Sequence, residues 1–132
     1  MAKFRDIQQD LESVFASPEW VATGIAAYPS TYDGPTGGGE FVRINIISGA
    51  GDVGGFSTYR VNGQLRLDLF VAGNDPDKRA NEIADILDSI LQGRTFTNGT
   101  QTRASFLANR GRDEASGSLT RYNYNLPFVY YS

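Results

Sequence analysis

A run of glycines near the middle of the chain matches a dinucleotide-binding pattern. Within SGAGDVGG, the residues from Gly49 to Gly54 fit G-x-G-x-x-G, which holds a pyrophosphate when a helix begins inside the motif. The segment that follows, FSTYRVNGQLRLDLF, is rich in β-branched and aromatic residues and therefore favours strands. Because no helix N-terminus is expected there to bind a phosphate, we interpret residues 49–55 as a glycine loop between two strands, with no cofactor.

The residue types that carry most enzyme chemistry are missing. The 132 residues include no His and no Cys, which excludes Ser-His-Asp triads, cysteine nucleophiles and ordinary structural zinc sites. Carboxylates remain, but Asp68 falls in a strand pattern, where we expect it to be solvated or paired with a neighbouring strand. Glu82, Asp85 and Asp88 recur at i,i+3 spacing and predict a solvated helix face. We therefore expect no catalytic residue and no metal site.

Composition and charge narrow the possible partners. The chain is 40% apolar and 20% charged, as in an ordinary globular domain, and we expect one domain over residues 1–132. No apolar run approaches the roughly 18 residues that predict a membrane span. Residues 1–88 carry a net charge of −6 and residues 89–132 a net charge of +3. With an isoelectric point near 4.8, sequence-specific or strong nucleic-acid binding is not expected.

The first third of the chain predicts a helix followed by strands. Residues 2–16 place apolar side chains at helical spacing, and Ser17-Pro18 should end that helix. The members of this apolar stripe are Phe4, Ile7, Leu11, Val14 and Phe15. Residues 20–29 and 41–48 read as strands, separated by a loop of turn residues at 30–40.

The middle of the chain predicts a β-hairpin and a second helix. Asn62-Gly63 lies between two alternating runs, residues 56–61 and 64–72, which is the sequence signal of a type I′ turn. The second arm alternates with period two, so Leu65, Leu67, Leu69 and Val71 should share a buried face. A helix should follow, with Asp75 as its N-cap and Gly93 at its end.

The last third of the chain predicts strands again. Residues 101–108 and 118–132 have strand composition, and residues 109–117 form a polar loop between them. The order of elements predicts an α+β fold, with a mainly antiparallel β-sheet and with the N-terminal helix and a second amphipathic helix packed on one face.

One long block resembles the central part of bacteriophage tail terminator (tail-completion) proteins. In that family a strand of the type G-x-L-x-x-x-x-F leads into a glycine turn and then into an amphipathic helix with an IAD-x-I/L core. The matching residues here are Gly63, Leu65, Phe70, Gly73, Ile83, Ala84, Asp85 and Leu87. The N-terminal helix ending near SPEW, the YPSTYDGP loop and the FVRINII strand also come in the family's order, so the resemblance covers nearly the whole chain.

The resemblance implies a structural protein of a virion. It implies a homo-oligomeric ring, usually of six copies, that sits on the last ring of the tail tube, ends its polymerisation and offers a surface to the head-tail connector or neck protein. Such a protein is assembled in the host cytoplasm, acts in the tail or neck and has no catalytic residues. Neck and head-completion proteins share this small α+β domain and are the alternative. A monomeric binding module and a small enzyme are the rival classes.

Unlike charges on the two parts of the chain suit a head-to-tail contact between copies. The polar loops at 30–40, 49–55 and 109–117 are then expected to reach toward the tube or the head. The same residues could instead form solvated loops. The candidate contact residues are Arg110, Arg112, Asp113, Glu114, Asp52 and Val53.

Overall fold

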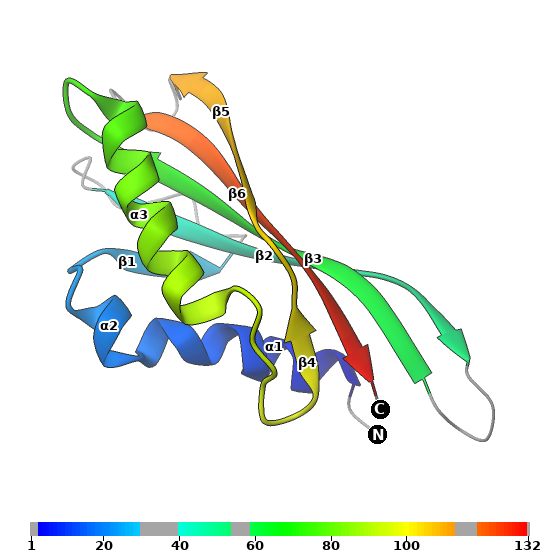
Figure 1. Cartoon of the computed structure of the whole chain (residues 1–132). Coiled ribbons are helices and arrows are strands. Elements are labelled where there is room, and N and C mark those ends of the chain that lie inside the picture. Colours follow the sequence, from blue (N-terminus) through cyan, green and yellow to red (C-terminus); the bar gives the residue numbers. More distant parts are fainter. Residues whose placement is uncertain (1–2, 30–39, 54–58, 113–118, 132) are drawn as a thin grey trace.

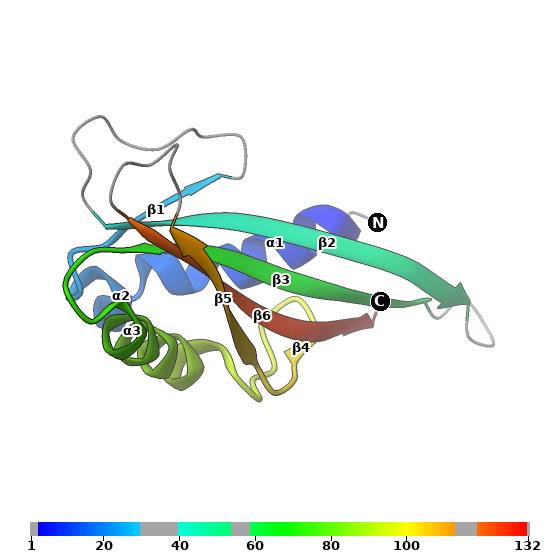
Figure 2. The ribbon, with the colours of Figure 1, turned by 90° about the horizontal axis from the view of Figure 1, so that it is seen from above.

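The protein has two layers in its computed structural model, which describes residues 3–29, 40–53, 59–112 and 119–131. One layer is a six-stranded β-sheet, and the other consists of helices that cover one face of that sheet (Figures 1 and 2). We call the other side of the sheet the open face, because none of the described helices packs on it. The expected α+β class, with its helices on one face, is confirmed.

The N-terminal helix forms where expected, but the chain then makes another helical turn. Helix α1 spans Lys3–Glu12 and continues as the 3-10 helix η1, Ser13–Ala16. Helix α2 spans Pro18–Val21, so the predicted strand at residues 20–29 is wrong in its first half. The reason is local: the Ser17 hydroxyl accepts a hydrogen bond from the Trp20 backbone N–H, and proline is well suited to a first helical position.

The sheet is mainly antiparallel, as expected. The strands follow the order β1-β2-β3-β6-β4, with β5 also paired to β6. Among the described strands, β1 and β2 form a parallel pair and the other pairs are antiparallel. The strand bounds are β1 Ala26–Pro29, β2 Phe41–Val53, β3 Tyr59–Val71, β4 Thr100–Thr102, β5 Phe106–Arg112 and β6 Thr120–Tyr131.

The predicted turn at Asn62-Gly63 is wrong. Strand β3 runs straight through both residues, and Gly63 pairs with Ser48 on one side and Phe128 on the other. A Cβ atom at Gly63 would lie 2.4 Å from the Ile47 carbonyl oxygen and 2.5 Å from the Phe128 ring. Position 63 is therefore a glycine because the neighbouring strand and the Phe128 ring come too close to it for a larger side chain. A glycine within a strand often marks such a close approach instead of a turn.

The glycine loop predicted at residues 49–55 is also corrected. Strand β2 continues to Val53, and its backbone pairs with β3 through a register shift between Ser48 and Gly51. Residues 54–58, which lead into β3, lie outside the described part. A strand with a bulge therefore stands where a pyrophosphate-binding motif would begin a helix.

The second helix confirms the sequence prediction closely. Helix α3 spans Pro76–Leu91, and the Asp75 carboxylate accepts a hydrogen bond of 3.2 Å from the Lys78 backbone N–H. Gly93 follows at a φ of +65°, a left-handed conformation that suits glycine after a helix.

The last third contains three strands rather than two. The expected strand at 101–108 is divided into β4 and the start of β5. The expected loop at 109–117 is strand β5 as far as Arg112, and residues 113–117 lie outside the described part. Strand β6 matches the expected strand at 118–132 to within two residues at its start and one at its end.

The core lies between the sheet and the helices. Alternate side chains of β3 point into it, so Leu65, Leu67, Leu69 and Val71 are buried as predicted. Helix α1 contributes Ile7 and Leu11, and helix α3 contributes Leu87. The exception is Phe4, which was predicted on the buried stripe but is 57% exposed.

Candidate functional site

Two of the predicted contact residues, Arg110 and Arg112, lie on strand β5. Arg110 is exposed, and its guanidinium donates a hydrogen bond to the Asn123 side chain on β6. The backbone of Arg112 pairs with Thr120. The interpretation of both as loop residues is therefore wrong. Asp113 and Glu114 lie outside the described residues.

The other two predicted contact residues, Asp52 and Val53, lie at the far end of strand β2. Their backbones pair with Arg60 and Tyr59 of β3, so they belong to the sheet and not to a connecting loop. Their side chains are outside the described part of the structure. Together with Arg110 and Arg112, they show that the candidate residues fall near opposite edges of one sheet, β2 and β5.

One edge of the sheet is left largely unpaired by the short strand β1. Strand β1 pairs with residues 41–44 of β2 only, and among the described residues no other strand covers β2 from Asn45 to Val53 on that side. Ile47 lies on this free segment and is 45% exposed. An unpaired edge presents backbone N–H and C=O groups that can bind a further strand.

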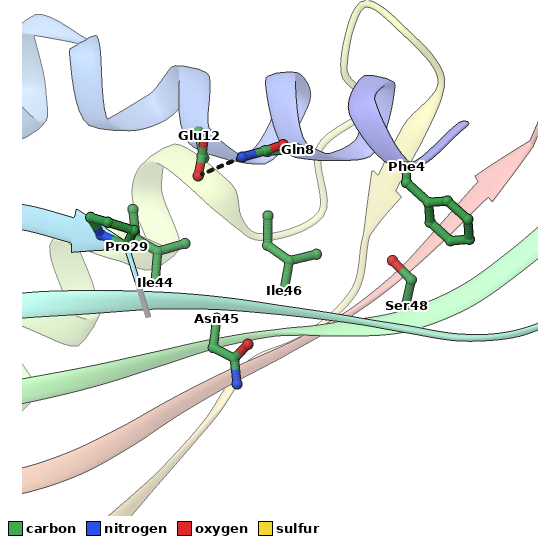
Figure 3. Close-up of a pocket in the computed structure, with 8 residues that line it drawn as sticks. All are labelled: Phe4, Gln8, Glu12, Pro29, Ile44, Asn45, Ile46 and Ser48. Atoms are coloured by element: carbon green, nitrogen blue, oxygen red, sulfur yellow. Dashed lines mark hydrogen bonds between the residues drawn. The ribbon is translucent and has the colours of Figure 1, made fainter. Parts of the chain in front are cut away.

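A groove runs between the free segment of β2 and helix α1. Its volume is about 410 Å³. Figure 3 shows Ile44, Ile46 and Ser48 pointing toward α1, whereas Asn45 points to the other side of the strand. The exposed Phe4 ring stands at one end of the groove. Apolar side chains thus flank the free edge on both faces, with Phe4 on the helix side and Ile47 on the open face.

The opposite edge of the sheet is strand β5. It pairs with β6, and no strand in the described part of the chain covers its outer side. Phe106, at the start of β5, is 53% exposed. It pairs in register with Asn125, which places it on the open face. Each free edge therefore carries an exposed apolar side chain on the open face.

The open face holds a small buried apolar cluster, formed by Phe41, Phe70 and Leu119, and beside it a group of polar and charged side chains. Asp68 on β3 forms ion pairs with Arg43 on β2 at 3.7 Å and with Arg121 on β6 at 3.2 Å. The Asn123 amide donates a hydrogen bond to Asp68. Arg66 and Arg110 both donate to the Asn123 side-chain oxygen. We call Arg43, Arg66, Arg110 and Arg121 the arginine cluster.

Sequence reasoning found only one member of this cluster. It proposed Arg110 as a contact residue but not Arg43, Arg66 or Arg121, because only the strand register brings these residues together. The expectation that Asp68 is either solvated or paired across strands is confirmed in its second form, since Asp68 is only 9% exposed.

Hydrogen bonds from three tyrosines of β6 join the helices to the inner face of the sheet. Tyr124 donates to Asp88 at 2.7 Å, and Tyr130 donates to Asp6 at 3.0 Å. Tyr122 donates to Asp77. Burial, followed by the hydrogen bond to Asp77, raises the pKa of Tyr122 to about 12. Burial is also the first cause of the raised pKa of Tyr124 and of Tyr130. These contacts stabilise the fold.

The helix face predicted to be solvated is only partly so. Glu82 and Asp85 are exposed, but Asp88 is held by Tyr124 and also by the Ser105 hydroxyl at 2.5 Å. No group of three or more possible ligand residues in the described ranges could hold a metal ion. None of the described helices is long and apolar enough to span a membrane.

Comparisons with known proteins found similarity in structure only. No known protein family matches the chain, and neither does any curated protein. A chain in the solved virion of a native gene transfer agent particle has a TM-score of 0.69 and 14% identity, over 99% of this chain and 98% of that one. Another solved structure, with no functional description, has a TM-score of 0.66 and 13% identity, over 96% and 94%. These values show a shared fold over the whole chain.

Proposed function

We propose that this chain is a structural protein of a phage-like virion, in which it forms a homo-oligomeric ring that caps the tail tube. The fold shared with a chain of a gene transfer agent virion supports the virion assignment. The resemblance of the block around residues 60–96 to tail terminator proteins supports the position at the tail end. In this role the ring ends tube polymerisation and offers its other side to the connector, without any turnover.

The observation that carries the proposal is the pair of free edges on one sheet. Strand directions alternate from β2 through β3 and β6 to β5, so β5 runs opposite to β2. A second copy in the same orientation can therefore place its β5 antiparallel against the free segment of β2. A contact between two different surfaces closes into a ring when the rotation fits, and closure leaves no free edge.

The exposed apolar side chains make this contact testable. Ile47→Lys places a charge on the β2 edge, and Phe106→Lys does the same on the β5 edge, so each variant alone should elute as a monomer. In a mixture, the Ile47→Lys variant keeps an intact β5 edge and the Phe106→Lys variant keeps an intact β2 edge. These two edges should pair, so the mixture should form a heterodimer. Gln64→Lys is the matched control, because Gln64 pairs directly with Ile47 but lies on the inner strand β3.

The readouts are molar mass by light scattering and ring images by electron microscopy. A wild-type monomer at all concentrations, or a heterodimer that never forms, would count against the edge contact.

Deleting the gene from its parent genome tests the position in the particle. Overgrown tails support a terminator, whereas tails of normal length that fail to join heads support the alternative, a neck or connector ring of the same fold. Normal infectious particles would exclude both.

A further inference from the structure

Helix α1 carries charges whose signs do not suit its own dipole. Arg5 lies in its first turn and Glu12 is its last residue, whereas a helix favours acidic side chains at its N-terminus and basic ones at its C-terminus. Glu12 lines the groove beside β2, and Arg5, seven residues earlier, lies on the same side of the helix and is exposed. In the part of the chain that the structure describes, neither residue forms an ion pair.

Helix α3 has a similar pair of charges on its exposed side. Lys78 lies in the first turn and Asp85 seven residues further on, and both side chains are exposed. Neither of them forms an ion pair within the described ranges. Asp85 is one turn away from Asp88, which accepts a hydrogen bond from Ser105 next to β5, so Asp85 lies on the β5 side of the helix.

The two helices lie beside the two free edges of the sheet. Helix α1 runs antiparallel to β2, because Phe4 stands near Ser48 and Glu12 stands near Ile44 across the groove (Figure 3). The contact proposed above places β5 of a neighbouring copy antiparallel against β2 on this side.

Helix α3 runs antiparallel to β5. Asp77, near the start of α3, accepts a hydrogen bond from Asn109, and Asp88, near its end, accepts one from Ser105. When β5 of the neighbouring copy lies antiparallel to β2, the α3 of that copy is therefore antiparallel to α1. Adjacent strands lie about 4.8 Å apart, so helices that lie beside these two strands come within packing distance of each other.

We propose that α1 packs against α3 of the neighbouring copy in the ring, with Arg5 facing Asp85 and Glu12 facing Lys78 of that copy. This inference rests on the proposed function, because the edge contact sets the direction of both helices. In the antiparallel arrangement Arg5 lies toward the C-terminus of the neighbouring helix, where its charge is favourable. The parallel arrangement would place Arg5 near Lys78, so the charges also specify the direction in which β5 is added to β2.

The heterodimer of the two edge variants contains a single contact of this kind. The Phe106→Lys chain contributes its β2 and α1 to the contact, and the Ile47→Lys chain contributes its β5 and α3. Arg5→Glu in the Phe106→Lys chain should weaken the heterodimer, because repulsion from Asp85 replaces attraction. The same substitution in the Ile47→Lys chain is the matched control, since the α1 of that chain lies beside the blocked edge.

The measurement is the Kd of the heterodimer by analytical ultracentrifugation at about 50 mM salt, where exposed charges are weakly screened. Arg5→Glu in the Phe106→Lys chain should raise the Kd roughly three- to tenfold, because exposed ion pairs contribute modestly, against less than about twofold in the control chain. Adding Asp85→Arg to the Ile47→Lys chain should return the Kd to within about twofold of its starting value.

The substitutions suit the helices that carry them, because Glu near the start of α1 agrees with the helix dipole. Far-UV circular dichroism checks that each chain folds. If the Arg5→Glu chain does not fold, Glu12→Lys in the Phe106→Lys chain and Lys78→Glu in the Ile47→Lys chain provide a second charge exchange with the same expected loss and recovery.

Three results would overturn the helix contact while the edge contact stands. They are an unchanged Kd with Arg5→Glu in the Phe106→Lys chain, an equal loss in the control chain, and a loss that Asp85→Arg does not recover. A starting heterodimer that does not form would refute the edge contact and the helix contact together. The two failures are thus distinguished by whether the starting pair associates.

Discussion

Gly63→Ala is the substitution whose effect follows most directly from the structure. The new Cβ atom would lie 2.4 Å from the Ile47 carbonyl oxygen and 2.5 Å from a carbon of the Phe128 ring, about 1 Å inside ordinary contact. The ring is 1% exposed, so it cannot turn away into solvent, and the carbonyl belongs to the neighbouring strand. Overpacking of this kind costs about 1–3 kcal/mol. With two close contacts, one of them to backbone, we expect about 2–3 kcal/mol.

Thermal and urea unfolding measure this cost. For a domain of this size each kcal/mol lowers the melting temperature by roughly 3–6 °C, so Gly63→Ala should melt about 6–18 °C below the wild type. Phe128→Leu should relieve one contact, and the double variant should therefore be more stable than the sum of the single losses predicts. Gln64→Ala, at the next and exposed position, should change the free energy of unfolding by less than about 0.5 kcal/mol. A Gly63→Ala variant as stable as the wild type would refute the strand assignment.

Three further predictions concern stability and ligands. Leu87→Asp places an unpaired charge at a fully buried position and should lower the free energy of unfolding by several kcal/mol, roughly the stability of a small domain. Glu82→Ala, on the exposed face of α3, should lower it by under about 0.5 kcal/mol in urea unfolding. Equal losses would mean that the faces of α3 are misassigned. Because the pKa of Tyr122 is raised from 10 to about 12, its contribution is complete below about pH 10 and is lost as the pH rises through about 12. Tyr122→Phe should therefore flatten the alkaline fall in the free energy of unfolding, and an unchanged slope would contradict this. NAD, NADP, FAD and ATP should leave the melting temperature unchanged, and a saturable rise of several degrees would reveal a nucleotide site.

Signals that act within a few residues were sufficient to predict helix α3. The Asp75 cap and Gly93 both lie beside the helix, and the structure uses each of them as the sequence predicted. The missed helix α2 had the same kind of signal, because Ser17 followed by Pro18 is also a helix start. That signal was interpreted only as the end of the preceding helix.

Long-range pairing explains the errors in the middle of the chain. Asn62-Gly63 has the composition of a turn, yet β3 is 13 residues long and pairs with both β2 and β6 along most of its length. Those ladder hydrogen bonds and the buried side chains outweigh a preference at two positions. The arginine cluster could not be predicted for the same reason, since Arg43 and Arg121 meet at Asp68 only through the register of three strands.

The register also changes how charge should be assigned to surfaces. The sequence suggested an acidic first part and a basic last third, but Arg43 and Arg66 of the first part join Arg110 and Arg121 on the open face. Several acidic side chains, among them Glu82 and Asp85, lie on the helix layer instead. Among these six residues, charge is divided by the face of the sheet and not by position in the chain.

This division has a consequence for a ring closed through sheet edges. Copies joined edge to edge in one orientation turn all their open faces to the same side. The helix layer adds bulk on the other face (Figure 2), and bulk is accommodated more easily on the convex outside of a closed sheet than on its concave inside. The open faces would then line the inside of the ring, and the helix layers would lie on its outside.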